Sequence, residues 1–161
     1  MAFLEERERK LRVLARIGER LNAQNITWAL GASALLYLKG LVPDFSDLDI
    51  MIKEEDAQRA QGVFAALGHQ LPAEQKPGFK TRYYRAFQIE GVAVDVMAGF
   101  TILFQGEEHY FPLKKEAITD YQELEGVLIP LQSLGEWRKY YELMGRWNKV
   151  EIIDRRRPPV S

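Results

Sequence analysis

The chain has 161 residues, the size of a single domain with a substantial hydrophobic core. Its composition, 47% hydrophobic and 28% charged, is typical of a soluble globular protein, and its net charge of -1 argues against a surface built to contact nucleic acid phosphates. The lack of cysteine excludes disulfides and thiolate metal sites, and the presence of only 2 histidines excludes most zinc chemistry.

Near the N-terminus, the segment Phe3–Asn22 has the pattern of a charged amphipathic helix, whose face rich in Glu and Arg we interpret as solvated. Its apolar positions, at near-helical spacing, are Leu4, Leu11, Leu14, Ile17 and Leu21. This acid-bearing N-terminus is not typical of a signal peptide, and the most apolar stretch, Trp28–Leu38, is too short to span a bilayer. We therefore expect a cytoplasmic protein with no membrane partner.

The segment Ile26–Leu38 has the pattern of a short strand, a tight turn at Gly31-Ala32-Ser33 and a short apolar helix. Small residues at such a turn allow backbone N–H groups to approach a phosphate, and the helix N-terminus adds a favourable partial charge. A simple turn that needs glycine for close packing would look the same. Taken alone, the segment leaves both interpretations open.

Two aspartates, Asp47 and Asp49, lie at the start of and within the apolar run Leu48–Ile52, which is typical of a buried strand. Because side chains alternate along a strand, the two carboxylates share one face, where they repel unless a positive charge compensates. A divalent cation with oxygen ligands does this well, magnesium in particular when substrate phosphates complete its shell. The pair predicts a metal–phosphate site; a pair at a strand end that faces water is the alternative.

A third acid, Asp95, lies in the middle of the apolar segment 92–98. Its side chain is expected on the face opposite the three valines of that segment. Buried carboxylates are seldom left unpaired. If this strand lies beside the one that holds Asp47 and Asp49, all three acids converge on one cluster.

The remaining elements follow from hydrophobic patterning and turn signals. A helix is expected over Glu54–Leu67, ended by Gly68, and a strand over residues 78–89 that turns at Glu90-Gly91 into the strand of Asp95. The other elements expected are strands over Phe100–Phe104, His109–Leu113 and Val127–Pro130, and a helix over Ser133–Arg146.

This order of elements predicts an α+β fold. We expect a small twisted mixed β-sheet of about four or five strands, with helices packed on one face and a cleft that holds the three acids on the other. Residues 1–153 are expected to form a single domain, and the tail 154–161, which contains three consecutive arginines and two prolines, to be disordered.

Three segments together resemble the signature of a known fold: Gly-Ala-Ser at 31–33, Ser-Asp-Leu-Asp-Ile at 46–50 and Val-Asp-Val-Met at 94–97. The pattern is similar to that of the nucleotidyltransferase fold, shared by DNA polymerase beta, the aminoglycoside and lincosamide nucleotidyltransferases and the minimal nucleotidyltransferases. That fold has a Gly-Gly or Gly-Ser turn, an Asp-x-Asp/Glu pair on the next strand and a third acid on a later strand. The resemblance covers roughly residues 26–150.

The resemblance implies a metal-dependent nucleotidyltransferase, which would move a nucleoside monophosphate from a nucleoside triphosphate to a hydroxyl of a small molecule or protein. Asp47, Asp49 and Asp95 would be catalytic and would bind Mg2+ or Mn2+, and Asp95 would hold the metal or accept the proton of the acceptor hydroxyl. The residues implied to bind the nucleotide are Gly31, Ala32, Ser33, Arg146 and Lys149.

Several other side chains have two open interpretations. Arg146 and Lys149 are three apart and can reach a triphosphate from one helical face, or they form a cationic helix end that complements the macrodipole. Arg82 and Arg85 fall on opposite faces of their strand, so at most one faces the cleft. The aromatic residues that would either stack on a base or belong to the core are Tyr83, Tyr84 and Trp137.

A different class of function is a catalytically reduced nucleotide-binding or antitoxin module of the same fold that acts on a protein partner. Ala32 keeps this alternative open, because it occupies the second position of the turn, where the fold has Gly or Ser. The short chain disfavours a glycosyltransferase, and Ile50-Met51-Ile52 does not fit a phosphatase with an aspartyl nucleophile.

Overall fold

The computed structural model describes residues 2–156. The helices are α1 (Ala2–Ala23), α2 (Ala32–Leu38), α3 (Ala57–Leu67), α4 (Leu134–Leu143) and α5 (Trp147–Asp154), with 3-10 turns η1 (Glu54–Asp56) and η2 (Lys115–Ala117). The strands are β1 (Trp28–Gly31), β2 (Leu48–Ile52), β3 (His69–Leu71), β4 (Tyr83–Ile89), β5 (Val92–Ala98), β6 (Phe100–Phe104), β7 (Glu107–Phe111), β8 (Asp120–Leu124) and β9 (Val127–Leu131).

The main sheet is mixed and has 7 strands in the order β3-β4-β5-β2-β1-β9-β8, and β6 and β7 form a second sheet of two strands. Strand β2 runs parallel to β5, and β1 runs parallel to β9. This confirms the α+β fold, but the sheet is wider than expected because β3 and β8 extend its two edges. Both are edge strands rich in polar, exposed residues, so neither has the apolar run that marks a buried strand.

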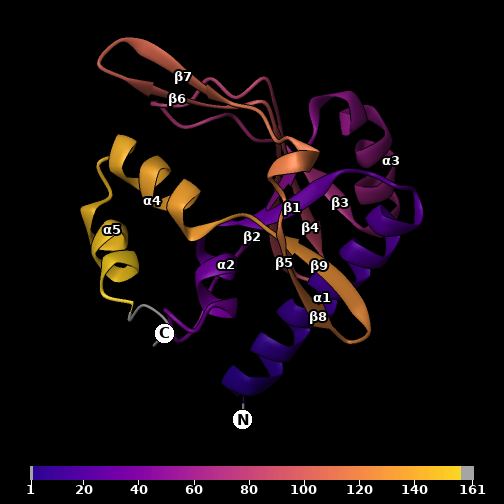
Figure 1. The fold of residues 1–161 in the computed structure, drawn as a ribbon. Helices are drawn as coiled ribbons and strands as arrows, with labels where there is room; N and C mark the ends of the chain where they lie inside the picture. The colour runs from indigo at the N-terminus through magenta and orange to yellow at the C-terminus, as the bar shows by residue number, and fades with distance from the viewer. Residues whose placement is uncertain (1, 157–161) are drawn as a thin grey trace.

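The core lies between one face of the main sheet and helices α1 and α3, which cover that face (Figure 1). Leu48, Ile50 and Ile52 of β2 point into it and are fully buried, as the alternation of side chains along a strand requires. Leu14 and Ile17 of α1 are fully buried as well. The intervening positions of β2 and β5 therefore point to the other face, where the acids were expected.

The strand expected over residues 78–89 divides between two sheets. Strand β4 begins only at Tyr83. The residues before it run beside β6 instead: Lys80 N–H donates to the Thr101 carbonyl at 3.0 Å, and Leu103 N–H donates to the Gly78 carbonyl at 2.8 Å. The β6–β7 hairpin also packs on α4, where the rings of Phe111 and Tyr140 are 4.7 Å apart. This joins the small sheet to the C-terminal helices.

The helix expected over Ser133–Arg146 is present as α4, but it ends earlier than expected, and a separate helix, α5, follows it. Ser133 caps α4 through a capping box with Glu136, and α4 ends at Leu143. Gly145 then adopts a φ of 74°, a left-handed conformation that ends the helix, and Arg146 is the N-cap of α5. Helix α5 includes Asp154, and residues 157–161 of the expected tail lie outside the described residues.

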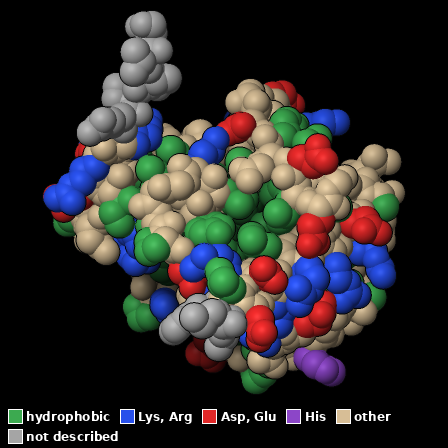
Figure 2. Space-filling model, turned by 90° about the horizontal axis from the view of Figure 1, so that it is seen from below, with side chains coloured by type: hydrophobic (Ala, Val, Ile, Leu, Met, Phe, Trp, Pro, Cys, Tyr) green, Lys and Arg blue, Asp and Glu red, His purple; other side chains and the backbone are tan. Residues whose placement is uncertain are grey.

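The surface carries charges of both signs. Figure 2 shows acidic and basic side chains interspersed on the face seen from below, around a group of hydrophobic side chains, in keeping with the net charge of -1. Among residues 2–156, none of the helices combines the length and the hydropathy needed to cross a bilayer.

Candidate metal and nucleotide site

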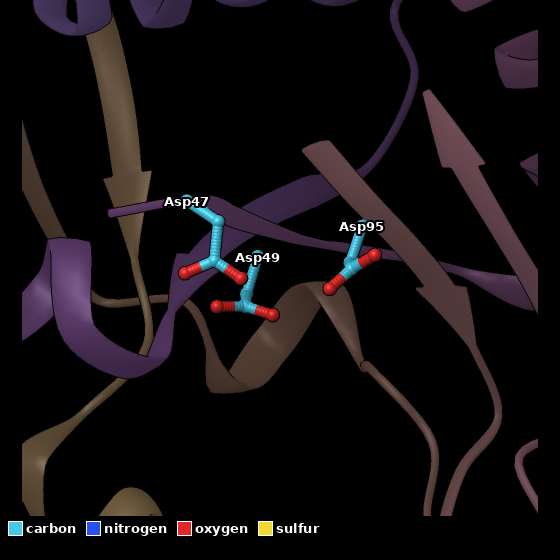
Figure 3. A group of neighbouring side chains, drawn as sticks. All are labelled: Asp47, Asp49 and Asp95. Atoms are coloured by element: carbon cyan, nitrogen blue, oxygen red, sulfur yellow. The ribbon is translucent and has the colours of Figure 1, made fainter. Parts of the chain in front are cut away.

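Three carboxylates form a cluster on the open face of the main sheet. Each of Asp47, Asp49 and Asp95 offers one carboxylate oxygen as a ligand, and these three oxygens lie within 4.8 Å of one another. Figure 3 shows the three side chains pointing into one common space from β2 and β5. We call this cluster the acidic floor. The convergence expected from the sequence is therefore present in the structure.

The register of two neighbouring strands produces the cluster. Strands β2 and β5 pair in parallel with Asp49 opposite Asp95, so both carboxylates project from the same face of the sheet. Asp47 immediately precedes β2, and its side chain continues the same alternation. The buried Leu48 and Val94, on the other face, fix this orientation because a slip of one residue would expose them.

The floor is electrostatically unfavourable in the absence of a cation. Burial, and then the charges of Asp47 and Asp95, raise the pKa of Asp49 well above its ordinary value of 3.8, while Lys76 and Arg146 act in the opposite direction. Burial also raises the pKa of Asp95, and a hydrogen bond from Tyr84 opposes that shift. The three acids therefore form a site that a cation would stabilise.

Tyr84 orients the third acid. Its Oη donates a hydrogen bond of 3.0 Å to Oδ1 of Asp95 from the adjacent strand β4. Burial and the Asp95 carboxylate raise the pKa of Tyr84 to about 12, so the phenol stays protonated and remains a donor at neutral pH. Of the aromatic residues with two open interpretations, Tyr84 thus lines the cleft, whereas Tyr83 instead hydrogen-bonds to Gln61.

The turn between β1 and α2 lies beside the floor. Gly31 pairs with Asp49 across the ladder, and Ala32 and Ser33 line the cleft. A Cβ at Gly31 would lie 2.5 Å from Cζ2 of Trp137, so glycine is needed there for close packing. Ala32 has a φ of 54°, the left-handed conformation that glycine adopts most easily. The turn expected from the sequence is therefore formed, and Gly31 itself has a packing role.

Three cations face the floor across the cleft, and we call them the cationic rim: Lys76, Arg146 and Lys149. Lys76 comes from the irregular segment before β4, whereas Arg146 and Lys149 come from the start of α5. The interpretation of these two residues as a cationic helix end is wrong, because they lie at a helix N-terminus, where the macrodipole disfavours cations. Burial and the charge of Arg146 lower the pKa of Lys149.

The segment that carries Lys76 is held in place by its neighbour. Gln75 accepts a hydrogen bond from Thr81 N–H at 2.8 Å and donates one to the Thr81 carbonyl at 2.9 Å, so its amide pairs with the backbone as a strand would. The sequence did not mark Lys76 as a site residue, because an isolated lysine in an irregular segment has no periodicity or motif.

The rest of the cleft is an aromatic wall, composed of Phe79, Phe100, Trp137 and Tyr141. Successive ring centroids along it are 6.0, 5.9 and 5.3 Å apart. The whole cleft has a volume of about 370 Å³, which is in the range of small-molecule sites. It thus combines a cluster of acids, a set of cations and a surface on which a flat ring can pack.

Two arginines lie near the cleft in sequence, Arg82 just before β4 and Arg85 within it, and neither lines the cleft. Arg82 forms an ion pair with Glu108 at 3.0 Å and lies over the ring of Tyr110. Arg85 lies over the ring of Tyr83, with its guanidinium carbon 4.4 Å from the centroid. Both side chains therefore belong to the surface around β4.

No protein-family model matches the sequence, and no curated protein matches it either. Solved structures do. The crystal structure of a Thermotoga maritima protein that has been proposed to be a nucleotidyltransferase is 24% identical, with a TM-score of 0.73 over 92% of this chain and 92% of that chain. The chain described here therefore has the nucleotidyltransferase fold.

Two further structures are antibiotic-modifying enzymes of that fold. ANT(2")-Ia in complex with adenylyl-2"-tobramycin is 9% identical, with a TM-score of 0.59 over 89% of this chain and 86% of that chain. The lincosamide antibiotic adenylyltransferase LnuA, lincomycin-bound, is 12% identical, with a TM-score of 0.53 over 85% of this chain and 91% of that chain. The resemblance inferred from the three sequence segments is confirmed at the level of the fold.

Proposed function

We propose that this protein is a metal-dependent nucleotidyltransferase, which moves a nucleoside monophosphate from a nucleoside triphosphate to a hydroxyl of a small-molecule or protein acceptor. The observation that carries the proposal is that the acidic floor and the cationic rim face each other across one cleft. A cluster of carboxylates favours divalent cations, and clustered Lys and Arg favour phosphates. A metal-bound nucleoside triphosphate provides both charges in one ligand.

The donor set fits Mg2+ or Mn2+. Asp47, Asp49 and Asp95 offer oxygen ligands only, and hard cations of this kind prefer carboxylates completed by water and phosphate oxygens. When bound, such an ion neutralises phosphate charge and aligns the reacting oxygens. Burial and the repulsion from Asp47 and Asp95 raise the pKa of Asp49, which supports the proposal because a cation between these groups would offset the repulsion.

The rim and the start of α5 are suited to bind the triphosphate. Arg146 and Lys149 lie at the N-terminus of this helix, where backbone N–H groups and the macrodipole also attract anions. Two cations placed where the helix itself disfavours them are most simply explained by an anion between them. Lys76, which lines the same cleft, would add a third cation, and the backbone of Ala32 and Ser33 would contact the terminal phosphates.

Asp95 is the group best placed to accept the proton of the acceptor hydroxyl. The hydrogen bond from Tyr84 orients its carboxylate within the cleft, where it would hold the metal or accept that proton. The structural neighbours support an acceptor hydroxyl: one was solved with adenylyl-2"-tobramycin, and another is a lincosamide adenylyltransferase. We place the reaction in the cytoplasm, as expected from the sequence.

The test is a transfer assay with ATP labelled at the α-phosphate, Mg2+, and tobramycin, lincomycin or a small-molecule cell extract as acceptors. We expect a labelled product and pyrophosphate, both lost in EDTA and in Asp49→Asn. If Mg2+ and ATP bind but no label is transferred to any acceptor or to a protein, the catalytically reduced module is the correct alternative. If Mg2+ and ATP do not bind, both functions are wrong.

A further inference from the structure

Asp47 is held differently from the other two acids. Asp49 and Asp95 lie opposite each other within the ladder of β2 and β5, and the backbone of each is fixed by neighbouring strands. Asp47 precedes the first paired residue of β2 and follows the loop that leaves α2 at Leu38. Its position therefore depends on how that loop is anchored.

A buried lysine is the main polar anchor of the loop; the other cation beside Asp44, Arg7, is more exposed and lies 3.7 Å from Oδ1. Lys10 of α1 has a side chain that is only 8% exposed, and its Nζ donates to Oδ1 of Asp44 at 3.1 Å and to the carbonyl of Phe45. Asp44 Oδ1 in turn accepts a hydrogen bond from Phe45 N–H at 2.8 Å. A single ammonium group thus binds two consecutive loop residues just before Asp47.

The ring of Phe45 completes the anchor. It lies under Lys10, with Nζ 4.8 Å from the ring centroid, and packs against Tyr37 of α2 at 5.0 Å. The loop is therefore attached both to α1, through the ammonium, and to α2, through the aromatic pair. Neither attachment touches the cleft, because Lys10, Tyr37 and Phe45 are not among the residues that line it.

A buried ammonium at position 10 would destabilise the protein if its only role were to fill space. A buried cation must be hydrogen-bonded to offset its lost hydration, and an apolar residue would fill the same space without that cost. The floor explains the need for a firm anchor. Its three carboxylates repel one another, and the repulsion acts most on the acid that the ladder does not hold. A loop fixed from behind keeps Asp47 within reach of the other two.

We propose that Lys10 is a positioning residue of the metal site, which holds Asp47 in the acidic floor by binding Asp44 and Phe45. The inference rests on the proposed function, since it assigns to Lys10 an effect on the metal affinity of that site. It predicts that the loss of the ammonium weakens metal binding even where the fold is intact.

The experiment compares Mn2+ binding, by titration calorimetry without nucleotide, with urea unfolding in EDTA. Lys10→Met keeps the length of the side chain and removes its charge. Lys39→Met is the matched control: it removes the ion pair of Lys39 with Asp120 at the other end of the same loop. We expect Lys10→Met to weaken Mn2+ binding about 10- to 100-fold, the range typical of residues that orient metal ligands, and the control to bind as wild type does.

Asp44→Asn provides a second variant in case Lys10→Met does not fold, because Asp44 is 42% exposed and its substitution leaves no buried cavity. It should weaken Mn2+ binding several-fold. A folded Lys10→Met variant with wild-type Mn2+ affinity overturns the inference, and so does wild-type affinity in Asp44→Asn. If the wild-type protein itself does not bind Mn2+, the proposed metal site is wrong and the inference falls with it.

Discussion

The two charged parts of the cleft are built in different ways. The acidic floor comes from adjacent strands, and its central pair, Asp49 and Asp95, is set by the register of one parallel ladder. The cationic rim comes from an irregular segment and a helix start that lie far apart in the sequence, at Lys76 and at Arg146 and Lys149. The central pair of the floor is therefore fixed by backbone pairing, whereas the rim is fixed by side-chain anchors and a helix break.

Each part is also unfavourable on its own. Burial, and then repulsion, raises the pKa of Asp49 and Asp95, and burial with a neighbouring cation lowers the pKa of Lys149. Like charges gathered in a cleft stabilise the folded protein less than neutral residues would, but they are suited to a ligand of opposite charge. Because the floor is suited to a cation and the rim to phosphates, substitutions in the floor should weaken metal binding, and substitutions in the rim should weaken nucleotide binding.

The largest effect is expected from Asp49→Asn, which breaks the floor and leaves the rim intact. Because loss of a ligand should cost more than loss of a residue that orients one, we expect Mn2+ affinity to fall by more than about 100-fold and transfer activity to disappear. Stability in EDTA should stay the same or rise, because a repelling charge is removed. Calorimetry and urea unfolding measure the two properties separately.

The pH dependence of that stability has a definite sign. Between the ordinary pKa of 3.8 and the raised pKa of folded Asp49, the folded state binds more protons than the unfolded state, so wild-type stability falls as pH rises through this window. The Asn variant lacks this contribution. Its advantage should be largest above the window and vanish below about pH 4. A variant that is clearly less stable at neutral pH would indicate a structural role for Asp49.

Arg146→Met should break the rim and leave the floor intact. Loss of a charge-assisted hydrogen bond to phosphate costs about 1.5–3 kcal/mol, so we expect the KM for the nucleoside triphosphate to rise about 10- to 100-fold. Mn2+ binding without nucleotide should not weaken. Arg155→Met, at the exposed far end of the same helix, is the matched control. Equal losses in both variants would show that a general charge effect is responsible.

Gly31→Ala tests the point where the two parts meet, since Gly31 pairs with Asp49 and packs under Trp137 of α4. The added methyl group would overlap the indole and the side chain of Gln132, which are hydrogen-bonded to each other at 2.7 Å. We expect a loss of about 1–3 kcal/mol in the free energy of unfolding. Wild-type stability in urea would mean that α4 shifts freely relative to the sheet.

The smallest effect is expected from Ala32→Gly. The φ of 54° at this residue is strained for alanine and ordinary for glycine, which stabilises the variant. Glycine also makes the unfolded chain more flexible, which destabilises the variant. These effects largely offset each other, so stability should change by less than about 1 kcal/mol, and transfer activity should be retained. A large gain in activity would instead indicate that alanine at this turn impairs the native enzyme.

The difference between floor and rim also decides what the sequence could predict. The alternation of side chains within a short apolar strand was enough to place Asp47 and Asp49 on one face, because that pattern is local. The convergence of Asp95 on them also required its strand to lie beside β2, as the structure shows. The anchors of the loops are not local. Lys10 acts on a loop 34 residues further along the chain, and Lys76 has no periodic context, so neither was identified.

The boundary between α4 and α5 was missed for a related reason. Gly145 is a common type of helix-ending residue, but its position one residue before Arg146 was not used to end the helix, and Arg146 was therefore assigned to the wrong helix end. The edge strands β3 and β8 were missed because exposed strands lack an apolar run. The buried centre of the fold was predictable, whereas its edges and the rim depend on contacts between distant segments.

The most direct test of the proposed site is the thermal unfolding of the wild-type protein with Mg2+ alone, with a nonhydrolysable ATP analogue alone, and with both at millimolar concentrations. A ligand that binds only the folded state raises the melting temperature, and floor and rim together should bind the metal and the nucleotide cooperatively. We predict a shift with both that exceeds the sum of the separate shifts. Identical melting curves in all conditions would contradict the proposal that this cleft binds a metal–nucleotide complex.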